Sequence, residues 1–149
     1  MYIILALAIC FVLPSTGFTT SKLSISRFGS TQTFAVVSII TKEQLDEIIS
    51  SNTASGKPAI VDFQKSQCKP CIRIAPEFEK LAEKYEQTVS FYKVDADSSK
   101  EALGLLKQEG VRSVPTFQIY FAGEKVDRVQ GAHLDQVEEI LEGILNSKN

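Results

Sequence analysis

The 149-residue sequence has no tryptophan, only three cysteines and one histidine, and no large excess of either sign of charge. Three cysteines are too few for a small domain that is held together by disulfide bonds. Because 16 basic residues nearly balance 18 acidic ones, we predict neither nucleic acid nor an anionic membrane as a partner. The composition that remains, 44% hydrophobic and 23% charged, is typical of one folded domain rather than of a disordered or fibrous chain.

Acidic residues are absent before Glu43, which sets an N-terminal leader apart from the rest of the chain. The leader starts with a 12-residue apolar run, Tyr2–Leu13, whereas a membrane-spanning helix needs about 20 residues. Proline and small residues follow up to Gly17, so we predict a signal peptide over residues 1–17 and no membrane span after its cleavage. No Lys or Arg precedes the run, and a buried strand or helix is the alternative. Cys10 would be removed with the leader and carries no predicted lipid anchor.

Residues 18–35 are rich in Ser and Thr and contain Lys22 and Arg27 but no acid, which is the composition of an organelle transit peptide. With Phe18 directly after the expected cleavage site, the two leader segments resemble the bipartite leaders of algae with secondary plastids. We therefore predict that the protein enters a plastid by way of the endoplasmic reticulum (ER). The alternative is a flexible linker in a protein that stays in the ER or is secreted.

The rest of the chain, residues 36–149, has the alternating strand and helix patterns of one domain. We expect strands at 36–40, 58–63, 89–94, 116–121 and 125–130. The first of four expected helices begins at a capping box at Thr41, and the second spans 71–85 with a kink at Pro76. The third runs from a second capping box at Ser98 to Gly110, and the fourth spans 134–145. The order is βαβαβαββα. Because parallel strands need helical crossovers, this order predicts an α/β fold with a central mixed sheet, helices on both faces and one antiparallel edge.

Cys68 and Cys71 form a Cys-Lys-Pro-Cys motif where a strand ends and a helix begins. Two thiols at this spacing can close a disulfide bond, and the start of a helix favours the thiolate form of the first one. The positive charge of Lys69 acts in the same direction. We expect the pKa of Cys68 to lie well below the value of about 8.5 of a free cysteine. Cys68 would then attack substrate disulfides, and Cys71 would be the resolving thiol.

The same motif occurs in zinc sites and in structural disulfides. A closed zinc site takes four Cys or His ligands, whereas the mature chain offers two cysteines and His133, so we predict no metal. A structural disulfide between residues three apart would constrain almost none of the chain. His133 is instead expected at the surface, as the cap of the last helix.

Asp62 is the second residue with predicted chemistry, because it lies inside the apolar strand at 58–63. Burial of an unpaired carboxylate raises its pKa and makes it a proton carrier near neutral pH. We expect Asp62 to accept the proton of Cys71. The alternative is a structural salt bridge with Lys93.

The Cys68–Cys71 motif (CxPC) is one of several short motifs between Val36 and Asn149. The others are VDF (Val61–Phe63), Pro76, VDAD (Val94–Asp97), VPT (Val114–Thr116) and Gly131-Ala132. Together they resemble the thioredoxin family. The resemblance implies a thioredoxin fold in which a cis peptide bond precedes Pro115. Pro115 would lie opposite Cys68, present the backbone of Val114 to the substrate and keep metals away from the thiols. Lys69, Pro70 and Gly131 would belong to the same substrate site. From the sequence alone, Pro115 could equally be a trans residue that opens a strand.

Departures from the family pattern surround the motif. Thioredoxins carry tryptophan immediately before the first Cys and again three positions earlier, where this chain has Gln67 and Gln64, and they carry glycine in place of Lys69. Loss of the aromatic side chains is expected to change the docking of substrates and of a reductase. The charge of Lys69 should make the disulfide somewhat more oxidising.

We therefore predict a thiol–disulfide oxidoreductase that reduces the disulfides of other proteins through a Cys68–Cys71 dithiol–disulfide cycle. It would act as a monomer without a bound cofactor and receive electrons from a ferredoxin-linked or NADPH-linked thioredoxin reductase. Two alternatives stay open. One is an isomerase-like oxidant of the secretory pathway, and the other is a redox-inactive binding module that lost catalysis together with the tryptophans.

Overall fold

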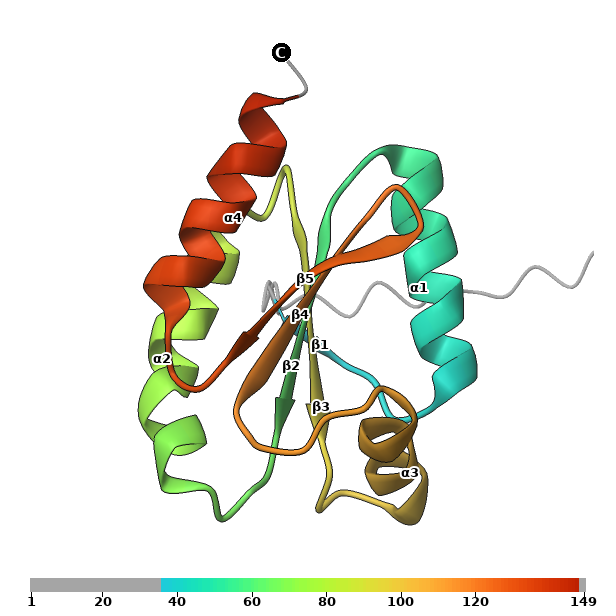
Figure 1. Ribbon diagram of the computed structural model, residues 1–149, viewed down its shortest axis with the longest axis vertical. Coiled ribbons are helices and arrows are strands. Elements are labelled where there is room, and N and C mark those ends of the chain that lie inside the picture. The colour runs from blue at the N-terminus through green and yellow to red at the C-terminus, as the bar shows by residue number, and fades with distance from the viewer. Residues whose placement is uncertain (1–35, 148–149) are drawn as a thin grey trace, which may run out of the picture. The chain divides into compact units, whose positions relative to one another are not determined.

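The computed structural model describes residues 36–147, in which a five-stranded mixed sheet lies between two pairs of helices (Figure 1). In chain order the elements are β1 (Val36–Ser38), α1 (Lys42–Ser55), β2 (Ala59–Gln64), α2 (Lys69–Lys84), β3 (Ser90–Asp95), α3 (Lys100–Gln108), β4 (Thr116–Phe121), β5 (Glu124–Gln130) and α4 (Leu134–Asn146). The strand order across the sheet is β1-β3-β2-β4-β5. Strands β1, β3 and β2 are parallel, whereas β4 is antiparallel to β2 and β5 to β4. The predicted α/β class, element order and mixed sheet are confirmed.

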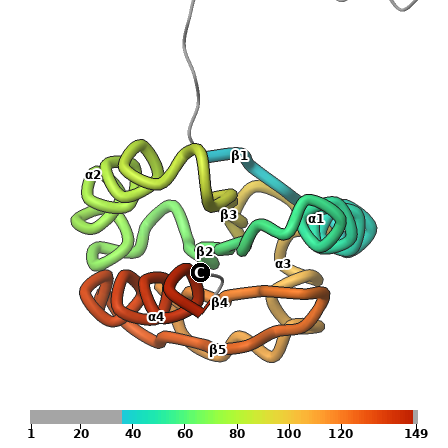
Figure 2. The backbone as a smooth tube through the Cα atoms, turned by 90° about the horizontal axis from the view of Figure 1, so that it is seen from above, coloured from blue at the N-terminus to red at the C-terminus, as the bar shows by residue number. Residues whose placement is uncertain are grey.

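Helices α2 and α4 cover one face of the sheet, and α1 and α3 cover the other (Figure 2). Each helix pair packs on its own cluster of buried side chains. Successive side chains of a strand point to opposite faces, so along β2 Ile60 belongs to the α2/α4 cluster while Val61 and Phe63 belong to the α1/α3 cluster. The same alternation directs the side chain of Asp62 toward the α2/α4 face.

The predicted capping box at Thr41 is confirmed. The Thr41 side chain accepts a hydrogen bond from the Gln44 N–H, and the Gln44 side chain accepts one from the Thr41 N–H. Gln44 also accepts the N–H of Ile40 at 2.9 Å. Strand β1 ends at Ser38, two residues before the predicted end, although the Ile39 N–H still donates to the carbonyl of Lys93 at 2.9 Å.

The expected capping box at Ser98 is wrong. Helix α3 is capped by Ser99, whose hydroxyl accepts the N–H of Ala102 at 3.0 Å, whereas the hydroxyl of Ser98 turns back to the carbonyl of Asp95. His133 lies at the surface in the N-cap position of α4, as expected, although its side chain makes no capping hydrogen bond. An exposed imidazole therefore remains at the start of the last helix.

The two predicted leader segments, residues 1–17 and 18–35, lie outside the described residues, as does Cys10. From residue 36 to residue 147, no helix has both the length and the apolar character that are needed to cross a membrane.

Candidate active site

Cys68 and Cys71 are joined by a disulfide bond at the start of α2, with their Cα atoms 5.2 Å apart. Cys68 is the N-cap residue of the helix and is half-buried, whereas Cys71 lies in the first turn and is only 1% exposed. The backbone N–H of Cys71 points at the Sγ atom of Cys68 at 3.3 Å. One sulfur is thus accessible and the other is covered, and a backbone dipole is directed at the accessible one.

Lys69 and Pro70 follow Cys68 in the first turn of α2, and both are exposed. The first N–H groups of a helix have no partner within it, so a proline in the first turn leaves no hydrogen bond unmade. Helix α2 therefore begins at Lys69 rather than at the predicted Cys71. Pro76 lies inside the same helix, as the sequence indicates.

The peptide bond between Val114 and Pro115 is cis, and Pro115 is buried. The carbonyl oxygen of Val114 lies 3.7 Å from the Sγ atom of Cys68. Pro115 directly precedes β4, and because β4 runs antiparallel to β2, the beginning of β4 lies beside the end of β2, which leads to the cysteines. Segments that are far apart in the sequence thus meet at the disulfide.

Gly131, directly after β5, supports this segment. Its backbone N–H donates a 2.8 Å hydrogen bond to the carbonyl oxygen of Pro115. Gly131 has a φ of +90°, which L side chains rarely adopt, and a Cβ atom added there would come within 3.1 Å of the His133 ring. Glycine at this position is therefore required by the backbone that meets Pro115.

Asp62 is 2% exposed, and its Oδ1 atom has no hydrogen-bond partner among the described residues. Burial raises the pKa of Asp62 to about 7, and the charge of Lys93 on the neighbouring strand opposes this only in part. The salt bridge that the sequence leaves open is not present, because no ion pair joins Asp62 to Lys93 in the described chain. A carboxyl group in this state can exchange a proton near neutral pH.

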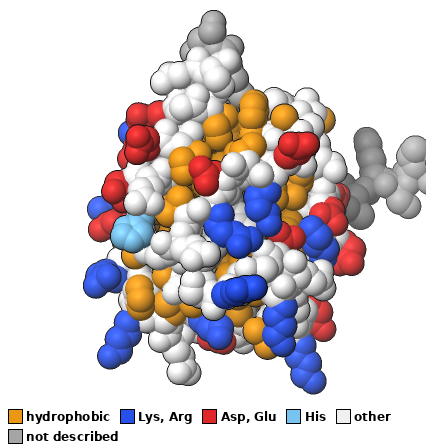
Figure 3. Space-filling view, in the orientation of Figure 1, with side chains coloured by type: hydrophobic (Ala, Val, Ile, Leu, Met, Phe, Trp, Pro, Cys, Tyr) orange, Lys and Arg blue, Asp and Glu red, His pale blue; other side chains and the backbone are white. Residues whose placement is uncertain are grey.

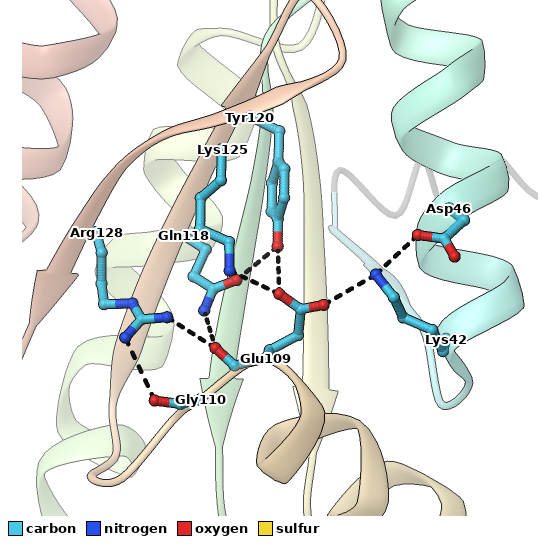
Figure 4. A network of polar contacts seen from close by, with 8 residues as sticks. All are labelled: Lys42, Asp46, Glu109, Gly110, Gln118, Tyr120, Lys125 and Arg128. Carbon is cyan, nitrogen blue, oxygen red and sulfur yellow. Dashed lines mark hydrogen bonds and ion pairs between the residues drawn. The ribbon is translucent and has the colours of Figure 1, made fainter.

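Sequence reasoning missed two polar clusters, and the first centres on Glu109 at the end of α3 (Figure 4). Its carboxylate accepts from Lys42 of α1 at 2.9 Å, from Lys125 of β5 at 2.7 Å and from the hydroxyl of Tyr120 at 3.1 Å. Burial alone would raise the pKa of Glu109, but the two lysines outweigh burial and lower it. Carboxylates are unfavourable at the C-terminal end of a helix, so Glu109 was a detectable sign of such partners.

Hydrogen bonds from other side chains also fix the backbone at Glu109 and Gly110. Its carbonyl oxygen accepts from Gln118 at 3.1 Å and from Arg128 at 2.7 Å, and Arg128 also donates to the carbonyl of Gly110. This Glu109 network therefore ties α1, β4 and β5 to the point where the loop toward Pro115 begins.

The second cluster fixes the residues just before Cys68. The hydroxyl of Ser66 donates to a carboxylate oxygen of Asp95, and its N–H donates to Asp97 at 3.0 Å. Asp95 and Asp97 belong to the VDAD motif at the end of β3. These bonds hold the loop between β2 and α2, where Gln67 replaces one tryptophan of the family pattern; Gln64, which replaces the other, is the last residue of β2.

Among residues 36–147, no group of three or more His, Cys, Asp or Glu side chains is arranged to hold a metal ion. The two cysteines are paired with each other, and His133 lies at the surface.

Comparison with known proteins agrees with this geometry. The thioredoxin family model matches residues 36–144. The chain belongs to the thioredoxin family. It is 40% identical over 95 residues to thioredoxin H4 of Arabidopsis thaliana, which covers 64% of this chain and 74% of the relative. As a member of this family, it is a thiol–disulfide oxidoreductase.

Two solved structures extend the likeness to three dimensions. Thioredoxin f from spinach chloroplast is similar at 35% identity and a TM-score of 0.64, covering 73% of this chain and 92% of that one. A thioredoxin f2 solved in a complex with ferredoxin:thioredoxin reductase is similar at 30% identity and a TM-score of 0.64, covering 72% of this chain and 93% of that one. Both TM-scores support the predicted thioredoxin fold.

Proposed function

We propose that this oxidoreductase works as a reductase of protein disulfides, with Cys68 as the nucleophile and Cys71 as the resolving thiol. The observation that carries the proposal is the position of Cys68, which is accessible at the start of α2 and lies 3.7 Å from the Val114 carbonyl before cis Pro115. After reduction of the pair, the Cys71 N–H and the α2 dipole favour a thiolate at Cys68. Lys69 adds a cation beside it.

The reaction transfers two electrons and two protons to the client protein. The Cys68 thiolate attacks one sulfur of the client disulfide, so that a mixed disulfide forms and the second client sulfur leaves as a thiolate that takes up a proton. Asp62 accepts the proton of Cys71, and the Cys71 thiolate attacks Sγ of Cys68. The Cys68–Cys71 disulfide closes, and the first client sulfur leaves as a thiol. Its proton is the one that Asp62 took up.

The backbone of Val114 and cis Pro115 would hold the client beside Cys68. An extended client segment would pair with the backbone of Val114, as a strand adds to the edge of a sheet. Lys69 and Pro70 would line one side of this segment, and Gly131 would act through its hydrogen bond to Pro115.

The chemistry is tested with the reduced full-length chain and a disulfide-containing model protein. Wild type should reduce the protein, and Cys68→Ser should not, while both give the same circular dichroism spectrum. Cys71→Ser should accumulate a mixed disulfide that a non-reducing gel resolves. Equal inactivity of folded wild type and Cys68→Ser would refute the proposal and favour a redox-inactive binding module.

We also propose a plastid location with a ferredoxin-linked reductase as the electron donor. Support comes from the composition of residues 18–35 and from the likeness to the spinach chloroplast thioredoxin f and to the thioredoxin f2 of the reductase complex. Sequencing of the mature N-terminus tests the location. A start near residue 35 is expected, whereas a start near Phe18 would favour an isomerase-like oxidant of the secretory pathway.

A further inference from the structure

A pocket of about 180 Å³ lies beside the active site, between α3 and the loop that leads to Pro115. Its apolar lining comes from Leu103 and Leu106 of α3 and from Val111 and Val114 of the loop. The side chains of Val111 and Val114 are half-buried, and Leu103 is 37% exposed. The pocket therefore offers an apolar surface that the fold itself does not cover.

The rest of the lining is basic, because Lys65, Lys107 and Arg112 complete the pocket together with Ser113. The three cations are exposed, and none of them makes an ion pair within residues 36–147. No acidic residue lines the pocket. In the space-filling view, basic side chains lie over the middle and the lower part of this face, which includes the side where Figure 1 places α3 (Figure 3). The net charge of the chain is −2, so this positive rim is a local feature.

Val114 lies between the pocket and the reactive sulfur. It lines the pocket, and its carbonyl oxygen lies 3.7 Å from Sγ of Cys68. A client segment that runs past Val114 with its disulfide at Cys68 would reach the pocket with a neighbouring side chain. The volume is smaller than the roughly 300–1,000 Å³ of sites for small molecules. It suits one apolar side chain instead.

We propose that this pocket is a specificity subsite that selects clients in which an apolar residue, flanked by Asp or Glu, lies near the disulfide. The inference rests on the proposed function, because it names the clients of the same site. The apolar side chain fills the space between Leu103 and Val114, and the flanking carboxylates face Lys107 and Arg112. Opposite charges at such a rim raise the rate of encounter more than they slow release, so the preference should depend on salt.

The test uses two synthetic peptides that each contain an intramolecular disulfide and a leucine near it. They are identical except that Asp and Glu beside the leucine in one peptide are Asn and Gln in the other. The reduced full-length chain should reduce the acidic peptide about fivefold to tenfold faster than the neutral one at low ionic strength. Addition of 0.5 M salt should remove most of this difference in rate. The reason is that the Debye length falls from about 30 Å at 0.01 M to a few Å near 1 M.

Charge reversal at the rim separates this pocket from the net charge of the protein. Lys107→Glu/Arg112→Glu should abolish or invert the preference. The matched control, Lys57→Glu/Lys80→Glu, changes the net charge equally but outside the pocket, since Lys57 precedes β2 and Lys80 lies in the second half of α2. That control should keep a preference for the acidic peptide.

The apolar part is tested by replacing the leucine of the acidic peptide with serine. This change should slow reduction by wild type about fivefold and should have little effect on reduction by Leu103→Gln. Equal rates for the acidic and neutral peptides, or a preference that survives reversal of Lys107 and Arg112, would overturn the inference. In those cases reduction of both peptides would leave the proposed function intact. Failure to reduce either peptide faster than Cys68→Ser would refute the function itself.

Discussion

Asp62 of β2 lies directly opposite Lys93 of β3 in the parallel ladder, yet no ion pair joins the two side chains within the described chain. The Lys93 charge lowers the pKa of Asp62 by less than burial raises it, so the pKa rises to about 7. A salt bridge would have fixed Asp62 as a permanent anion. Without one, the carboxyl group can hold or release a proton under physiological conditions.

We expect Asp62→Asn to slow the resolving step, because Cys71 loses its proton acceptor. The loss should be about tenfold to a hundredfold at pH 8, where wild-type Asp62 is ionised, and should shrink below about pH 6, where it is protonated. Single-turnover reduction of a model protein at a series of pH values measures the effect. The control is Glu139→Gln, which makes the same charge change on the surface of α4. Equal rates for Asp62→Asn and wild type between about pH 6 and 8 would remove Asp62 from the mechanism.

The same variant should stabilise the fold at alkaline pH. Because the folded-state pKa of about 7 exceeds the unfolded value near 3.8, the folded protein binds the proton more strongly, and stability falls as the pH rises from about 4 to 7. Asp62→Asn removes that loss, so its free energy of unfolding at pH 8 should exceed the wild-type value, by about 4 kcal/mol at most. Denaturant titrations at pH 4 and 8 test this. A constant difference at both pH values would contradict a raised pKa.

Glu109→Gln should destabilise the protein at neutral pH. The Glu109 side chain is 8% exposed, and the change leaves Lys42 and Lys125 without their shared carboxylate. Both lysines are about one-third exposed, so we expect a loss of about 1–3 kcal/mol rather than the full cost of breaking a buried ion pair.

The pH dependence of this loss has the opposite sign to that of Asp62. The pKa of Glu109 is lowered in the folded state, so the stabilisation is present above the unfolded pKa and disappears as the pH falls through the folded value. Urea unfolding of wild type and Glu109→Gln should therefore converge in acid. The exposed Glu79→Gln serves as the control, and a difference that persists in acid would argue against the ion pairs as its cause.

Gly131→Ala should impair the site through the backbone. Alanine is strained at a φ of +90°, and the strain would weaken the 2.8 Å hydrogen bond to the carbonyl of Pro115. We expect a loss of about 1–3 kcal/mol in stability and a raised KM for protein clients. The matched control is Gly143→Ala in α4, where a Cβ meets no atom within 4 Å. That variant should be more stable by about 0.5–1 kcal/mol, because alanine is the better helix former. Equal effects of the two variants would refute the assigned role of Gly131.

Lys69→Gly should make the reduced Cys68 less nucleophilic at acidic pH. The exposed ammonium group lies one residue from Cys68 at the start of α2, where it favours the thiolate. Alkylation of the reduced protein at about pH 6 should slow roughly twofold to fivefold, and the disulfide should become less oxidising. Lys57→Gly at the opposite end of β2 is the control. Unchanged alkylation in Lys69→Gly would leave the helix start and the Cys71 N–H as the groups that act on Cys68.

Local sequence patterns predicted much of the fold because they encode local physics. The Thr41-x-x-Gln44 box specifies two hydrogen bonds over four residues, and both are formed. The run at 58–63 is apolar apart from Asp62 and predicts a strand. The structure buries residues on both faces of this strand, which is why nearly all of them are apolar. Element boundaries moved by one or two residues where side chains competed for backbone groups, as at Ser98 and Ser99.

The site was predictable where spacing or a family resemblance fixed the geometry. Cys68 and Cys71 are three residues apart, so a helix start brings their sulfurs together without help from the rest of the chain. The Glu109 network could not be derived in this way, because its partners come from α1, β4 and β5. The packing of α1 and β5 around the end of α3 decides that Lys42 and Lys125 reach the same carboxylate.

The pairing of β2 with β4 has a consequence for the order in which the site forms. Phe63 is opposite Thr116, so the cysteines and the cis proline become neighbours only when strands from the two halves of the chain associate. A chain folded only as far as α3 would already hold both cysteines at the start of α2 but would lack the Val114 carbonyl that lies beside Cys68. We therefore expect the site to be complete only after β4 has joined the sheet.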